Sequence, residues 1–310
     1  MNIKKLYKYI GISVLVLSPL ESVFAQQDAQ FTQYMYNTIN VNPAYAGSRG
    51  VMSVFGNYRT QWVGLDGAPK TASLSVHTPL SNSRLGLGMS LINDQIGAMD
   101  ENTIAVDVSY TIDLNRDYKL SFGLKGSANL LNVDYTKLNI YNPNDGLFEE
   151  NIDSQFTPNI GAGVYLHSDK AYLGFSIPNF LEMQRYDEYS VSTMKQKMNY
   201  YLIGGYVFDW GSQLKFKPAF LAKAVAGAPV QVDVTANFLI AEKVTLGVAY
   251  RWDAAVSGIV GFQISDGLFI GYSYDADTTK LGTYNSGSHE IFMRFELFSR
   301  FNRITSPRFF

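Results

Sequence analysis

The chain has 310 residues, a formal net charge of −2 and no cysteine. Without cysteine it can form neither a disulfide framework nor a thiolate zinc site. The near-neutral balance argues against nucleic-acid binding, which normally relies on a basic patch or stripe. We therefore expect no nucleic-acid partner.

The N-terminal residues have the three parts of a secretory signal peptide. Lysines 4, 5 and 8 form a positive region, and an apolar run follows from Ile10 to Leu20. Val23-Phe24-Ala25 supplies a small-residue cleavage site, so we expect cleavage after Ala25. The apolar run is too short for a membrane-spanning helix, which needs about 20 residues. No later stretch is long enough either, and 14% of the residues are aromatic. An exported, aromatic-rich chain of this kind favours a membrane β-barrel.

Alternation of apolar and polar residues predicts the strands of such a barrel. In Thr103–Ile112, one face carries the apolar side chains of Ile104, Val106, Val108, Tyr110 and Ile112. The predicted strands begin near Met52, Thr71, Leu85, Thr103, Leu120, Pro158, Ala171, Asn199, Leu214, Val232, Val244, Val256, Leu268 and His289. We predict an all-β fold, a transmembrane outer-membrane β-barrel of about 14 antiparallel strands, because single-chain bacterial barrels have even strand numbers.

A soluble β-sandwich would show the same alternation with its apolar face turned inward. The strand lengths, the aromatic residues near strand ends and the spacing of the connections favour the barrel. Short connections, such as 113–118 and 241–243, alternate with long ones at 132–157, 178–198 and 276–287. Outer-membrane barrels have short periplasmic turns and long outer loops. We divide the chain into a signal peptide (1–25), a periplasmic or luminal strap (26–50), the barrel (51–298) and a periplasmic tail (299–310).

Charged residues of both signs lie on the faces that would line the lumen. They are Lys125, Lys215, Lys217, Lys223, Arg251 and Arg294 against Asp107, Asp233, Glu290 and Glu296. Opposite charges on neighbouring strands can pair across the ladder. We therefore predict cross-strand ion pairs rather than an ion-selective lining.

The sequence holds little that indicates catalysis. Its three histidines, His77, His167 and His289, lack the close spacing of metal ligands, and no nucleophile elbow or phosphate-binding loop occurs. His289 with Asp275 or Glu290 is the one candidate for a hydrolase dyad. A polar histidine at the base of a loop is the alternative that we favour, so we expect no enzyme activity, no cofactor and no metal.

The stretches on either side of the first predicted strand are the most distinctive part of the chain. One reads Gln30-Phe31-Thr32-Gln33-Tyr34, followed by Asn42-Pro43-Ala44-Tyr45-Ala46-Gly47. The other runs from Tyr58-Arg59-Thr60-Gln61-Trp62 to Gly67-Ala68-Pro69-Lys70-Thr71. Asn42-Pro43 and Gly47 indicate a turn. The aromatic residues before it fit a short helix, a luminal plug or a strap across the periplasmic mouth.

Together these elements resemble the PorP/SprF family of Bacteroidota outer-membrane proteins. The resemblance implies a non-enzymatic component of the type IX secretion system, which supports export or surface anchoring of a secreted protein such as a gliding adhesin. The implied partners are a secreted protein with a type IX C-terminal sorting domain, and periplasmic secretion-ring or peptidoglycan-binding lipoproteins. The candidate partner-binding residues of these motifs are Gln30, Phe31, Gln33, Tyr34, Asn42, Pro43, Ala44, Tyr45, Gly47, Tyr58, Arg59, Gln61 and Trp62.

Two further surfaces are candidates for partner binding. The long outer loops carry residues of types enriched at interfaces, namely Tyr141, Phe148, Phe180, Met183, Tyr186 and Tyr189. The C-terminal tail carries Arg300, Arg303, Arg308 and Phe310 and is a periplasmic docking peptide or a barrel-assembly signal. A passive porin, embedded in outer-membrane lipid like the scaffold, is the alternative function.

Overall fold

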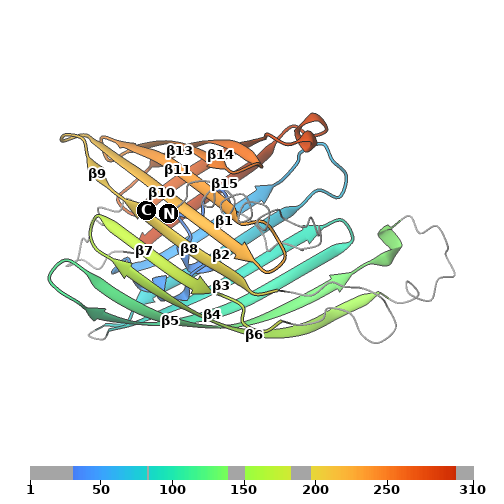
Figure 1. Cartoon of the computed structure of the whole chain (residues 1–310), viewed down its shortest axis with the longest axis horizontal. Coiled ribbons are helices and arrows are strands. Elements are labelled where there is room, and N and C mark those ends of the chain that lie inside the picture. The colour runs from blue at the N-terminus through green and yellow to red at the C-terminus, as the bar shows by residue number, and fades with distance from the viewer. Residues whose placement is uncertain (1–30, 82–83, 139–150, 183–196, 298–310) are drawn as a thin grey trace, which may run out of the picture.

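The computed structural model describes residues 31–81, 84–138, 151–182 and 197–297. These residues form one closed antiparallel barrel (Figure 1). Its strands are β1 (Met52–Thr60), β2 (Lys70–Pro79), β3 (Leu85–Ile96), β4 (Met99–Asp113), β5 (Lys119–Val133), β6 (Ile152–His167), β7 (Ala171–Ile177), β8 (Asn199–Tyr206), β10 (Leu214–Val225), β11 (Gln231–Ile240), β12 (Val244–Arg251), β13 (Ala255–Gln263), β14 (Leu268–Asp277) and β15 (Ser288–Leu297). The two-residue β9 (Phe208–Asp209) continues β8 along β10. The wall therefore has 14 strands within the described residues, which confirms the predicted fold.

Consecutive strands pair with one another, and β1 closes the barrel against β15. The closing register joins Met52 to Leu297 and Thr60 to His289. The connections β2–β3, β4–β5, β6–β7 and β11–β12 are short turns at one end of the barrel. The long connections β5–β6 and β7–β8 lie at the other end (Figure 1). Because outer-membrane barrels place short turns in the periplasm, we call the first end periplasmic and the second end outer.

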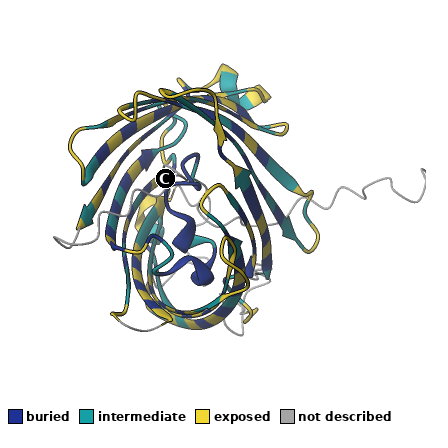
Figure 2. Cartoon of the chain, turned by 90° about the vertical axis from the view of Figure 1, so that its left-hand side faces the viewer, coloured by how far each residue is buried: buried dark blue, intermediate teal, exposed yellow. Residues whose placement is uncertain are grey.

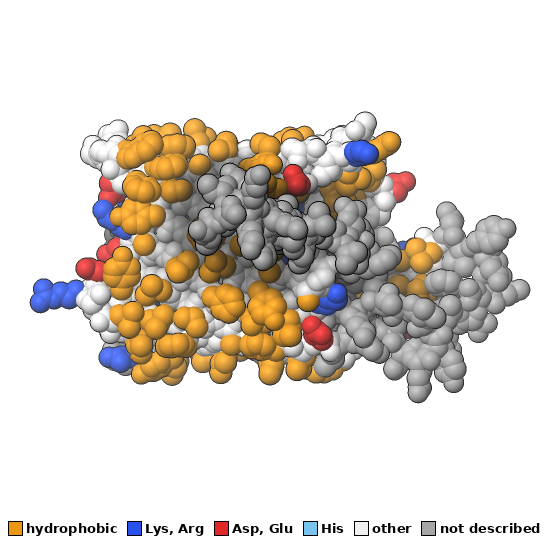
Figure 3. All heavy atoms as spheres, viewed as in Figure 1, with side chains coloured by type: hydrophobic (Ala, Val, Ile, Leu, Met, Phe, Trp, Pro, Cys, Tyr) orange, Lys and Arg blue, Asp and Glu red, His pale blue; other side chains and the backbone are white. Residues whose placement is uncertain are grey.

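The outside of the barrel carries an apolar band. On β4 the outward side chains of Ile104, Val106, Val108 and Tyr110 are exposed, while Ala105, Asp107 and Ser109 between them are buried in the lumen. In Figure 3, hydrophobic side chains cover the described part of one face, and charged side chains gather toward its ends. In the described part of the chain, no helix has the length and apolarity to cross a membrane.

The apolar outer face ends before the outer ends of β3 and β4. Beyond Leu91, the outward positions become polar: the Asn93 amide donates hydrogen bonds to Asp100 (2.8 Å) and Asn102 (2.9 Å). The opposite face of the same segments lines an internal cavity with both apolar and acidic side chains, such as Ile96 and Glu101. We call Ile92–Ile96 with Met99–Thr103 the projecting wall, since its polarity indicates that it stands above the bilayer. In this region the strand continues without the apolar alternation of a membrane strand. For this reason β4 begins at Met99 rather than at the predicted Thr103.

Candidate functional site: the plug and its contacts in the lumen

Residues 31–50 lie inside the barrel, and we call them the plug. Figure 2, which views the barrel from its periplasmic end, shows this buried segment coiled within the wall. It contains two short 3-10 helices, η1 (Thr38–Asn40) and η2 (Pro43–Tyr45). Ile39, Asn42 and Ala44 have no exposed surface. The predicted motif residues Phe31, Gln33, Tyr34, Asn42, Pro43, Ala44, Tyr45 and Gly47 all belong to the plug.

Asn42 and Pro43 start a turn that lies against β5 and β6. The Asn42 side chain accepts a hydrogen bond from the Ala44 amide (3.0 Å), so Asn42 is the N-cap of η2. Pro43 follows at the first helical position, where a missing N–H has no cost. The Asn42 amide nitrogen also donates to the Val164 carbonyl of β6 (3.0 Å). One side chain thus shapes the turn and attaches it to the wall.

The wall opposite this turn lacks side chains where the plug backbone comes closest. A β-carbon at Gly123 would overlap the backbone of Pro43 and Ala44. One at Gly86 would overlap the Ala46 carbonyl, and one at Gly163 the Asn42 side chain. We call Gly86, Gly123 and Gly163 the seat glycines. Their inward positions on β3, β5 and β6 allow the plug to lie directly against the strands.

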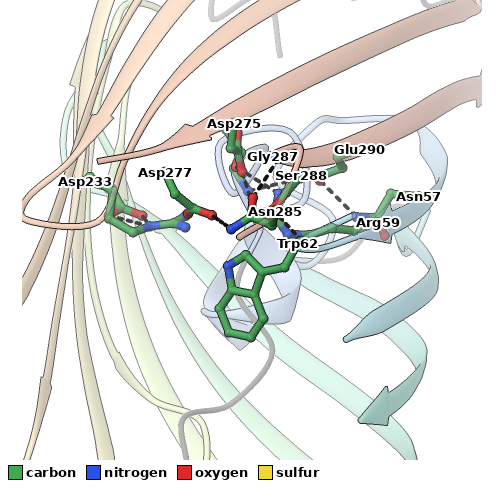
Figure 4. Close-up of polar contacts among 12 residues, drawn as sticks. Asn57, Arg59, Trp62, Asp233, Asp275, Asp277, Asn285, Gly287, Ser288 and Glu290 are labelled. Carbon is green, nitrogen blue, oxygen red and sulfur yellow. Dashed lines mark hydrogen bonds and ion pairs between the residues drawn. The ribbon is translucent and has the colours of Figure 1, made fainter. Parts of the chain in front are cut away.

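Buried charged side chains bind the end of the plug that lies in the outer half of the lumen (Figure 4). Arg59 of β1 contacts Asp275 (2.6 Å) and Glu290 (3.1 Å), and its side chain is only 2% exposed. Thr32 of the plug donates its backbone N–H to Glu290 (3.1 Å) and its hydroxyl to Asp275 (2.7 Å). The Asn57 amide donates to the other oxygen of Glu290 (3.0 Å). We call Thr32, Asn57, Arg59, Asp275 and Glu290 the outer anchor.

The middle of the plug is bound through its backbone carbonyls. Lys125 of β5 donates to the carbonyls of Ile39 and Asn40, both at 3.3 Å, and pairs with Asp107 at 3.5 Å. Ser176 of β7 donates its hydroxyl to the Val41 carbonyl (2.6 Å). These bonds satisfy plug backbone groups that would otherwise be buried without a partner.

The periplasmic end of the plug is held by charge and aromatic contacts. Arg49 pairs with Glu296 of β15. Burial alone would lower the pKa of Arg49, but Tyr45 and Glu296 outweigh it and hold that pKa above its usual value. The Gly47 amide donates to His77 (3.2 Å), whose ring meets Tyr45 edge-on at 5.3 Å. Contacts therefore extend from the outer half of the lumen to its periplasmic end.

Aromatic stacking fixes the plug against the opposite wall. The Tyr36 ring lies 5.4 Å from that of Phe269 on β14 and 4.7 Å from that of Phe292 on β15. Burial raises the pKa of the Tyr36 phenol. Since an ionised phenol would be unstable here, Tyr36 stays neutral at physiological pH.

Two predicted cross-strand ion pairs are present in the lumen. Arg251 of β12 pairs with Asp233 of β11 (3.1 Å), and Lys125 of β5 pairs with Asp107 of β4 (3.5 Å). Arg294 contacts Glu296 (3.5 Å), but these two residues lie on the same strand, β15. Lys217 and Lys223 instead lie over the rings of Tyr172 (4.8 Å) and Tyr201 (5.7 Å). Such cation–π contacts stabilise a buried ammonium group.

A cavity of about 150 Å³ lies on the outer side of the plug. Phe31, Asn40 and Val41 of the plug contribute to its lining, as do Ile96 and Met99 of the projecting wall. We call this space the outer cavity. Residues of the plug and of the wall therefore line this space together.

The second family motif divides among three environments. Arg59 belongs to the outer anchor, whereas Tyr58 faces outward and is exposed. Gln61 donates its backbone N–H to Pro69 (2.9 Å) across the β1–β2 loop. Trp62 has a positive φ of 45°, held by a hydrogen bond from its amide to Ser288 (3.2 Å). Its indole points away from the anchor contacts (Figure 4). A bulky residue in this conformation is unusual and indicates a local functional constraint.

Most of the other predicted partner-binding residues lie outside the described residues. Only Phe180 is described; it is partly exposed, and its amide donates to Ile160 (2.8 Å). The residues outside are Gln30, Tyr141, Phe148, Met183, Tyr186, Tyr189, Arg300, Arg303, Arg308 and Phe310.

The hydrolase dyad considered for His289 does not form. His289 lies on the outward side of β15, where its Nδ1 is 2.6 Å from the Tyr272 hydroxyl. Glu290, the next residue on β15, and Asp275 on β14 point into the lumen, where they bind Arg59. Among the described residues, no group of three His, Asp or Glu side chains could hold a metal ion.

Sequence reasoning missed the seat glycines and most of the outer anchor. Gly86, Gly123 and Gly163 all fall at inward positions of strands that had been predicted, so their repetition was a readable signal for a close approach of backbone. Thr32, Asn57 and Asp275 carried no comparable signal, because their partners lie far away in the sequence.

Solved structures similar to this chain are outer-membrane barrels. The Ralstonia pickettii toluene transporter TbuX matches with a TM-score of 0.50 and 10% identity, covering 85% of this chain and 92% of its own. The Acinetobacter baumannii outer-membrane protein Omp33 matches with a TM-score of 0.48 and 9% identity, covering 80% of this chain and 98% of its own. At such identity the likeness to TbuX concerns the fold alone. A search of curated proteins found no significant match.

The family comparison covers nearly all of the chain. The family model described as "Type IX secretion system membrane protein PorP/SprF" matches residues 23–295, which include the plug and 14 strands. That description denotes a membrane component of a secretion system. The protein is an outer-membrane β-barrel and belongs to the PorP/SprF family of type IX secretion system membrane proteins.

Proposed function

We propose that this barrel supports export or surface anchoring of a secreted protein, such as a gliding adhesin with a type IX C-terminal sorting domain, and binds it at the outer end. The observation that carries the proposal is the outer cavity, which residues of the plug and of the projecting wall line together. A passive porin needs a continuous lumen, and the plug is bound along its length by Arg59, Lys125 and Glu296. No described feature favours the porin.

The projecting wall supports an outer docking surface. Its inward side presents Ile96, which is 38% exposed, together with Ile92 and Met99. The acidic residues Asp94 and Glu101 alternate with these apolar residues on the same side. Its outward side is polar and internally hydrogen-bonded, as in the bond from Gln95 to Asp100 (2.9 Å). Apolar side chains that face the outer cavity above the bilayer suit burial against another protein.

Site-specific photo-crosslinking in cells tests this surface. A photoreactive residue replaces Ile96, and the matched control carries it at the adjacent Gln95, which faces the opposite side. We expect the Ile96 variant to capture a large secreted protein that ends in a sorting domain, and the Gln95 variant to capture none. Equal capture by both variants, or no capture by either, would contradict docking in the outer cavity.

We further propose that the periplasmic end contacts the secretion-ring or peptidoglycan-binding lipoproteins through the tail (299–310). Deleting residues 299–310 distinguishes this role from a barrel-assembly signal. Normal barrel levels with loss of the lipoproteins in co-purification would support docking. Loss of the folded barrel from the outer membrane would instead identify an assembly signal.

A further inference from the structure

An apolar hollow interrupts the lipid-facing side of β11–β14. Its floor consists of Ala236, Val248 and Gly258, which are cross-strand neighbours in one row. Phe238, Leu246 and Tyr274 surround this row, and the hollow measures about 440 Å³. A β-carbon at Gly258 would meet no atom within 4 Å. The hollow therefore results from missing side chains at the surface rather than from a gap in the wall.

The depth of the hollow places it in the outer half of the membrane. Gly258 lies near the outer end of β13 and pairs with Tyr274. The Tyr274 hydroxyl donates to the Ser286 carbonyl (3.1 Å) in the outer β14–β15 loop. The Tyr272 hydroxyl, which also borders the hollow, is bonded to His289 (2.6 Å). Both hydroxyl groups are thus hydrogen-bonded at the outer edge of the hollow, and the aromatic rings of the two tyrosines line it.

The occupant of this hollow must be apolar along its length. The strands beneath it are paired on both sides, so they have no free edge to hydrogen-bond a peptide strand. A polypeptide in contact with lipid must satisfy its own backbone groups, whereas a hydrocarbon chain has none to satisfy. Dispersion contacts with Phe238, Leu246 and Tyr274 suit methylene groups.

We infer that the hollow binds one acyl chain of an outer-leaflet lipid as a fixed ligand of the barrel. This site is separate from the outer cavity and does not depend on the proposed function. The bound chain would complete the surface of β11–β14 where Ala236 and Gly258 leave it incomplete.

Native mass spectrometry of the whole barrel, purified in mild detergent and titrated with a saturated-chain phosphatidylethanolamine, tests the inference. Gly258→Leu fills the hollow. Gly126→Leu is the matched control, because Gly126 on β5 is also lipid-facing with no atom within 4 Å of an added β-carbon. We expect one retained lipid in the wild type and in Gly126→Leu, and at least a tenfold lower occupancy in Gly258→Leu.

A second variant tests the site in case Gly258→Leu prevents the barrel from folding. Val248→Phe fills the same hollow from β12, where Val248 is already exposed. Loss of the lipid in both filling variants, with a folded barrel by gel mobility, would support the site. Equal retention in all variants, equal loss in Gly126→Leu, or a retained protein instead of a lipid would overturn it.

Discussion

The two sides of the lumen hold the plug by different means. On β3, β5 and β6, the seat glycines leave room for the plug backbone to lie against the strands. On β14 and β15, large side chains such as Phe269 and Phe292 project inward and stack on Tyr36. On this side, Gly271 makes room for the ring of Phe292, a residue of the wall, rather than for the plug. One side fits the plug by shape, whereas the other holds it by side-chain contacts.

This difference shows that the plug is an integral part of the barrel. A movable gate would need an interface that can separate at low cost, but the outer anchor would leave buried charges behind. Removing one member of a buried charge group typically costs about 3–5 kcal/mol. The contacts on the two sides can be weakened separately, and three variants rank their contributions.

The largest effect is expected from the outer anchor. Arg59→Met leaves Asp275 and Glu290 buried without their cation, so the free energy of unfolding should fall by about 3–5 kcal/mol. Urea titration of the barrel in detergent micelles measures it. Lys119→Met is the control, since Lys119 and Asp113 are 3.9 Å apart with side chains 55% and 58% exposed. That pair contributes about 0–1 kcal/mol. Equal losses in the two variants would rule out a structural role for the anchor.

A smaller effect is expected from the seat glycines. Gly123→Val places a side chain where Pro43 and Ala44 lie, and overpacking of this kind costs about 1–3 kcal/mol. We also expect conductance steps in planar bilayers, because the displaced plug opens the lumen. Gly126→Val, three residues along β5 but lipid-facing, should be silent and as stable as the wild type. A silent Gly123→Val barrel of normal stability would show that the seat is dispensable.

The smallest effect concerns the ionisation of Tyr36. Burial raises the pKa of this phenol above its ordinary value of 10.0. Stability from the raised pKa is therefore fully present below pH 10 and is lost as pH rises beyond it. Ultraviolet titration should show one late-ionising tyrosine fewer in Tyr36→Phe than in the wild type. Loss of a tyrosine from the group that ionises near pH 10 would instead mean that Tyr36 is accessible to water.

Alternation was enough to predict the barrel, because lipid and lumen impose opposite demands on successive residues. It failed where the environment changes along a strand. At Met99–Asn102 the outward side chains of β3 and β4 become polar, so the apolar alternation that predicts a membrane strand is lost there. The early start of β6 at Ile152, rather than near Pro158, belongs to the same outer region.

The candidate site was less predictable than the fold. Family motifs identified the residues of the plug, but not what they contact. Asn42 binds Val164 and Thr32 binds Glu290, across separations that no local pattern records. Motif residues alone also could not show that Tyr58 faces lipid while its neighbour Arg59 is buried in the lumen.

The course of the plug has a consequence for how the two ends of the chain are joined. Thr32 is bound in the outer half of the lumen, whereas Arg49 is bound near the periplasmic end, just before β1. The final β1–β15 seam joins strands from opposite ends of the chain, and pairings of such long range form late in folding. Because Thr32 and Arg49 bind β14 and β15, the plug contacts the last strands of the chain. In the closed barrel, the two ends of the described chain are therefore joined both by the seam and by the plug.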